Sequence, residues 1–148
     1  MKRFILGTLA FIAVLLFAFF IEGGNPLDFI LPSPLLIVVG VPVFAVLAVW
    51  GLKDWGRAWK DAFAKKGAPS AAASAAISSA KLWDFYEKAC YIAGIVGFIL
   101  GLNIIFQNKG NLNGEIFRPL AVDCVTPILA IVFAMVARVL KARVESRA

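Results

Sequence analysis

The chain has 148 residues, of which 61% are hydrophobic and only 16% are charged, against about 45–50% and 25% in soluble domains. This composition excludes an ordinary water-soluble domain and predicts an all-α polytopic membrane protein with a single membrane domain, residues 1–148. The net charge of +6 arises from basic residues beside apolar runs, which argues for a lipid bilayer and against nucleic acid as a partner.

The sequence contains no histidine, the commonest metal ligand, and it has two cysteines, Cys90 and Cys124. These cysteines fall near opposite ends of two apolar segments, so on helices they lie at different membrane depths, too far apart for a disulfide. We therefore expect no metal site and no cofactor, and we do not expect an enzyme.

The first apolar segment, residues 4–21, follows Lys2 and Arg3 and contains no charged residue. At about 18 residues it is longer than the apolar core of a secretory signal, and no small-x-small cleavage motif follows it. We predict a retained transmembrane helix.

A second apolar segment, residues 34–50, contains Pro42 near its middle, where a kink is expected. In residues 52–66, apolar side chains recur at three- and four-residue spacing and charged side chains take the other face. This pattern predicts an amphipathic helix in the headgroup region of a membrane, within a cytoplasmic loop, residues 51–82. The aromatic members of the apolar stripe are Trp55, Trp59 and Phe63.

Two further apolar segments, residues 89–106 and 120–140, complete a set of four predicted transmembrane helices. Between the second and third of these spans, residues 67–80 are nearly all Ala and Ser. That composition fits either a flexible linker or the start of a long Ala-rich helix, and the sequence leaves both alternatives open.

The distribution of basic residues predicts the orientation of the spans. With the N-terminus inside, 13 of the 15 Lys and Arg residues lie on the cytoplasmic side, and only Lys109 and Arg118 lie outside. This asymmetry follows the positive-inside rule and places both termini in the cytoplasm.

Small residues recur along one face of each of the last two spans. In lipid there is no hydrophobic drive between helices, so close approach depends on such residues. We therefore expect these two helices to pack together, and we assign six of their small residues to subunit packing: Ala89, Ala93, Gly97, Gly101, Ala130 and Ala134. The stripe of the fourth span also includes Thr126 and Ala137.

Asp123 lies one turn before Thr126 on the small-residue face of the fourth span. Acidic residues inside spans are costly and usually face a bundle interior or a cavity. Pro127 adds a second polar feature, because it lacks the N–H that would bond a carbonyl one turn earlier. We assign Asp123, Thr126 and Pro127 to an ion pathway; the alternatives are an interfacial position for Asp123 and a bond from Thr126 to its own helix backbone.

Three stretches of the sequence resemble the MotA/TolQ/ExbB proton-channel family, particularly its four-span MotA branch. They are Glu22-Gly23-Gly24 with Leu31-Pro32-Ser33-Pro34-Leu35-Leu36-Ile37-Val38-Val39-Gly40, the Gly-rich run Ala93-Gly94-Ile95-Val96-Gly97-Phe98-Ile99-Leu100-Gly101-Leu102, and Leu120-Ala121 through Thr126-Pro127. The resemblance implies a homopentamer in the bacterial inner membrane around two copies of a one-span partner of the MotB/ExbD/TolR kind. It also implies that ion flow drives rotation of one component inside the other.

Two departures from the family pattern lead to two hypotheses. The cytoplasmic segment is only about 30 residues long, so the usual torque-transmitting domain is missing. Phe98 replaces the hydroxyl residue of many relatives, which removes a possible sodium ligand and favours protons or no conduction at all. The first hypothesis is a pentameric subunit of an ion-driven motor or energy-transducing complex. The alternative is a non-conducting scaffold protein with the same fold.

Overall fold

The computed structural model of the chain describes residues 32–64, 73–107 and 117–146, together with Gly7, Ala10, Ala13, Val14 and Phe17 as single residues. The prediction of an all-α fold is confirmed for this part of the chain. Apart from those five residues, the predicted first span, residues 4–21, lies outside the described residues. The described elements in chain order are α2 (Pro32–Leu35), the π-helical turn η2 (Leu36–Gly40), α3 (Val41–Phe63), α4 (Ala73–Gln107) and α5 (Phe117–Glu145).

Three of the described helical segments are long and apolar enough to cross a membrane: Leu36–Phe63, Ala76–Gln107 and Leu120–Glu145. Large apolar side chains cover much of their outer surface; Ile92, for example, is 62% exposed. Such surfaces are what a lipid-facing helix presents, because acyl chains rather than water surround it. The fourth span, the orientation and the oligomeric state stay predictions.

The second predicted span contains a π-helical turn, η2, directly before Pro42. A proline ring meets the carbonyl four residues earlier, here that of Val38, and it supplies no N–H. A π turn is wider than an α turn, and η2 contains Val38. The wider turn therefore lies where the Val38 carbonyl needs room beside the proline ring. We expected Pro42 itself to kink this span, but the sharp change of direction lies further along the chain.

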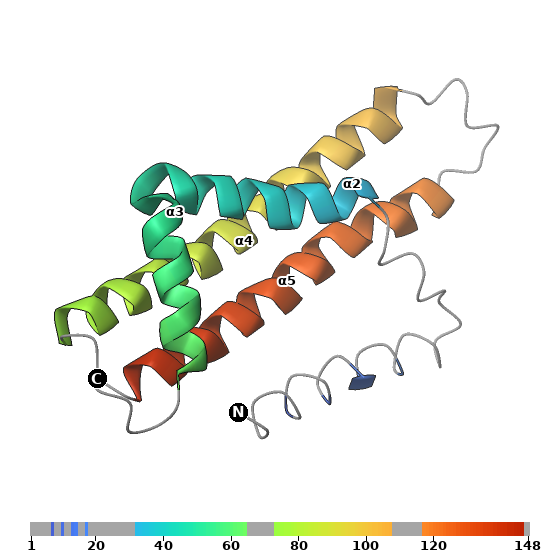
Figure 1. Cartoon of the computed structure of the whole chain (residues 1–148). Coiled ribbons are helices and arrows are strands. Elements are labelled where there is room, and N and C mark those ends of the chain that lie inside the picture. Colours follow the sequence, from blue (N-terminus) through green and yellow to red (C-terminus); the bar gives the residue numbers. More distant parts are fainter. Residues whose placement is uncertain are drawn as a thin grey trace.

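That change of direction is at Gly51, the residue between the predicted second span and the predicted amphipathic helix. Gly51 has φ 77° and ψ 171°, a left-handed conformation that residues with a Cβ rarely adopt. Figure 1 shows α3 turning sharply and then crossing one end of the α4 and α5 helices. We call residues 52–63, the part of α3 after the turn, the corner helix.

Helices α4 and α5 run antiparallel and lie side by side over most of their length (Figure 1). Helix α4 begins at Ala73, well before the predicted start of the third span at Ala89. The Ala-rich stretch is therefore helical from residue 73 to residue 80. For these residues the prediction of a long Ala-rich helix is confirmed, and the alternative of a flexible linker is wrong.

The larger of two buried clusters lies where the corner helix meets α4 and α5. Trp83 and Leu82 of α4 and Leu140 of α5 are each 1% exposed there. A smaller cluster joins Val38 of η2 to Val125 and Leu129 of α5. The α4–α5 pair is thus the centre of the fold, with α3 packed on one side of it.

Candidate functional site

The small-residue faces of α4 and α5 meet directly, and we call this contact the glycine seam. A Cβ built on Gly97 would lie 2.7 Å from Cγ2 of Thr126, closer than real Cβ atoms approach other atoms. Cβ atoms built on Gly94 and Gly101 would overlap Ala130 and Asp123 still more severely. The helices approach this closely only because α4 has no side chain at these three positions.

The three contacts form one continuous antiparallel face. As the residue number rises from Gly94 to Gly101 on α4, it falls by the same seven residues from Ala130 to Asp123 on α5. Spacings of three and four residues keep a single stripe of each helix facing its neighbour. The structure therefore brings together Asp123, Thr126 and Gly101, which the sequence had placed on separate spans.

Asp123 is the acidic member of the seam and is only 9% exposed. Its carboxylate occupies the space that a side chain at position 101 would fill. Among the described residues, its buried Oδ2 atom has no hydrogen-bond partner. A buried oxygen without a hydrogen-bond donor lowers the stability of an apolar helix pair. An acidic residue at such a position is therefore a candidate functional group.

Pro127 removes one helix hydrogen-bond donor opposite the same residue. In an α-helix the N–H of residue 127 would bond the carbonyl of Asp123, and proline has no N–H. Thr126, between them on the seam, is 3% exposed and turns its methyl group toward Gly97. Asp123 therefore combines a carboxylate that can take up a proton with a backbone carbonyl that lacks the usual donor four residues later.

Three of the residues predicted to mediate subunit packing, Gly97, Gly101 and Ala130, meet the neighbouring helix of the same chain in this seam. Ala93 and Ala134 are also buried within the chain, while Ala89 is half-buried. Contacts between chains would have to form on other surfaces, and a role for these residues in such contacts stays a prediction.

The aromatic stripe of the corner helix packs on α4. The ring of Trp55 lies 5.5 Å from the rings of both Trp83 and Tyr86, and Trp59 lies 5.0 Å from Trp83. Phe63 stacks on Trp59 at 5.7 Å. Sequence reasoning assigned Trp55, Trp59 and Phe63 to a membrane interface and missed these protein contacts, although Trp83 and Tyr86 share a helix face at three-residue spacing.

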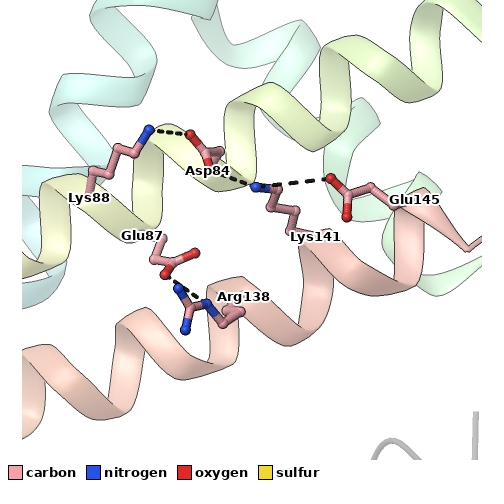
Figure 2. Close-up of polar contacts among 6 residues, drawn as sticks. All are labelled: Asp84, Glu87, Lys88, Arg138, Lys141 and Glu145. Atoms are coloured by element: carbon pink, nitrogen blue, oxygen red, sulfur yellow. Dashed lines mark hydrogen bonds and ion pairs between the residues drawn. The ribbon is translucent and has the colours of Figure 1, made fainter.

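A second polar region, which we call the charged end, lies on α4 and α5 at the opposite end from Asp123. Figure 2 shows two pairs joining the helices: Lys141 Nζ lies 2.6 Å from Asp84 Oδ1, and Arg138 Nε lies 3.0 Å from Glu87 Oε1. Glu87 is 6% exposed, so Arg138 balances a buried charge. Two pairs within helices complete the region, Lys88 with Asp84 at 2.7 Å and Lys141 with Glu145 at 4.0 Å.

The described residues hold no cluster of three or more His, Cys, Asp or Glu side chains that could bind a metal ion. Both cysteines are free: Cys90 is buried and Cys124 is exposed.

A comparison with protein-family models, with curated proteins and with solved structures found no match for this chain. The resemblance to the MotA/TolQ/ExbB family thus stands on the sequence motifs alone. Function has to be inferred from the residues of the seam.

Proposed function

We propose that the chain is a subunit of an ion-driven complex of the bacterial inner membrane, forming a pentamer around the helix of a one-span partner. The observation that carries this proposal is Asp123, a carboxylate buried between two apolar helices with an oxygen that lacks a partner among the described residues. Intramembrane carboxylates of this kind usually belong to ion or proton pathways.

The surroundings of Asp123 favour a proton as the ion. Both carboxylate oxygens lie against the backbone of α4 at Gly101, which leaves little room around them for a coordination shell. Hard metal cations take about six oxygen ligands, whereas a proton needs a single acceptor. The phenyl ring of Phe98, where relatives carry a hydroxyl, removes a further possible ligand.

In this arrangement α4 covers Asp123, so proton exchange requires the glycine seam to loosen at that end. A partner helix carrying its own carboxylate would exchange a proton with Asp123 when the seam opens. Thr126 and the backbone carbonyl of Asp123 would hold the water between the two carboxylates.

A second candidate, a non-conducting scaffold of the same fold, is favoured by the same close packing. The seam at Gly94, Gly97 and Gly101 is shut in this structure. A permanently closed seam would make Asp123 a structural residue and leave no route for an ion.

Proton flux through the reconstituted complex separates the two candidates. The full chain is purified together with a copurifying one-span protein, incorporated into liposomes, and proton entry under a pH gradient is followed with an enclosed pH-sensitive dye. We expect flux from the unaltered complex and none from Asp123→Asn. Asp54→Asn is the matched control, because Asp54 lies on the corner helix in an exposed pair with Arg57.

A complex without flux, or equal flux from Asp123→Asn and the unaltered chain, would refute the ion-pathway assignment. The proposed assembly would be refuted if the purified chain were a monomer and bound no one-span partner. This result would have to hold at every detergent concentration that preserves the helicity of the chain.

A further inference from the structure

The corner helix has three distinct faces. One face packs on α4 and α5 through Trp55 and through Ala58 and Ala62, both fully buried. A second face is basic and exposed, and a third is apolar and exposed. The basic face contains Lys53, Arg57 and Lys60, and the exposed apolar face contains Leu52 at 75% and Trp59 at 38% exposure.

Contacts with α4 fix the depth of the corner helix relative to the apolar part of that span. Trp55 and Trp59 touch Trp83 and Tyr86, which come three to six residues before Ala89, where the apolar segment begins. At 1.5 Å per residue, the corner helix lies about 5–9 Å outside the hydrocarbon edge.

Helix α5 gives the same depth independently. The guanidinium carbon of Arg143 lies 5.7 Å from the ring centre of Phe63, at the end of the corner helix. Arg143 comes three residues after Leu140, the end of the predicted fourth span, which corresponds to about 5 Å. Since the headgroup layer occupies about 5–7 Å on each side of the hydrocarbon core, the corner helix lies at the level of the headgroups and reaches their outer edge.

We infer that the corner helix is a binding surface for anionic phospholipid headgroups. Lys53 and Lys60 contact the headgroup phosphates, while Leu52 and Trp59 insert among the first carbons of the acyl chains. Asp54 offsets the charge of Arg57, with which it pairs at 3.2 Å. The Asp61 carboxylate is directed toward α4, where it accepts a hydrogen bond from the Ser79 hydroxyl at 2.6 Å, so Lys53 and Lys60 supply the positive charge of the exposed face.

This surface depends on the chain lying in a membrane and not on ion conduction. The sharp turn at Gly51 carries the helix across the end of the α4–α5 pair, as Figure 1 shows, and so brings its basic face alongside the headgroups. A straight continuation of α3 would instead carry Lys53 and Lys60 away from the membrane surface.

The test measures the preference of the full chain for anionic over zwitterionic lipid. The protein is reconstituted in phosphatidylcholine vesicles with trace spin-labelled phosphatidylglycerol or phosphatidylcholine, and the motionally restricted fraction of each label is compared. A basic residue near a membrane surface contributes about 1 kcal/mol, so each of Lys53→Gln and Lys60→Gln should lower the preference about fivefold. Lys81→Gln is the matched control, an exposed lysine on α4 about 12 Å beyond the hydrocarbon edge, and should change it little.

High salt provides a second arm that needs no variant. The preference of the unaltered chain should fall between about 0.1 M and 1 M salt, because the Debye length shortens from about 10 Å to about 3 Å. An unchanged preference in Lys53→Gln/Lys60→Gln, an equal loss in Lys81→Gln, or a preference insensitive to salt would overturn the assignment. Proton flux can fail in every complex while this lipid preference persists, so the two proposals are tested separately.

Discussion

The glycine seam and the charged end belong to the same two helices, yet they hold α4 and α5 together in different ways. At the seam, glycine brings backbone close to backbone, and the side chains opposite are Ala130, Thr126 and Asp123. At the charged end the contacts are ion pairs, such as Asp84 with Lys141, beside the aromatic cluster of the corner helix.

The difference corresponds to the two environments that the sequence predicts for the helices. Where lipid surrounds the pair, association depends on van der Waals contact, and small residues maximise it. Where headgroups and water are present, charged side chains keep part of their hydration, and bulky aromatic rings bury additional area. Asp123 is the exception to this division, because it is an acidic residue at the glycine end.

The largest expected effect comes from removing the centre of the aromatic cluster that lies beside the charged end. Trp83 is 1% exposed and contacts rings of the corner helix, so Trp83→Ala should destabilise the chain by about 3–5 kcal/mol. Thermal unfolding in detergent micelles, followed by circular dichroism, measures the effect. Trp59→Ala, at a 38% exposed position, should cost clearly less. Equal losses in both variants would mean that Trp83 is not the centre of the cluster.

An intermediate effect is expected at the glycine seam. Gly94→Ala places a methyl group where the Ala130 methyl already lies, and overpacking of this kind costs about 1–3 kcal/mol. Gly56→Ala is the control, because no atom lies within 4 Å of a Cβ there, and it should stabilise its helix by up to about 1 kcal/mol. The same unfolding assay applies, and stabilisation by Gly94→Ala would show that the helices are not in contact at this position.

The smallest effects are expected from the ion pairs, and they should divide according to burial. Arg138→Gln leaves the buried Glu87 without its cation and should cost about 1 kcal/mol, since the Arg138 side chain itself is 71% exposed. Lys88→Gln removes an exposed pair within one helix and should cost about 0.3 kcal/mol. A larger loss from Lys88→Gln than from Arg138→Gln would contradict the burial of Glu87.

Most of the described helices could be predicted from periodicity and from the ends of apolar runs. The break between residues 34–50 and the amphipathic helix falls at Gly51, and the small stripes of the last two spans meet as expected. Such features are local, since the spacing of apolar, small and charged residues determines which face of a helix must be covered.

What could not be predicted depends on contacts between helices distant in sequence. The stripes indicate which faces meet but not their register, so the sequence did not pair Gly101 with Asp123. The bridges from α4 to Arg138 and Lys141 depend on the same register. An aromatic stripe suits lipid and protein equally well, which is why the contacts of Trp55 with α4 were missed.

The most direct test of the account is a double-mutant cycle between Gly101 and Asp123, measured by the same unfolding assay on the full chain. Gly101→Ala should be strongly destabilising in the unaltered chain, because the new methyl group would overlap the carboxylate. In the Asp123→Ala background it should cost little, giving a coupling of about 2 kcal/mol. An equal cost of Gly101→Ala in both backgrounds would contradict the burial of the Asp123 carboxylate against α4.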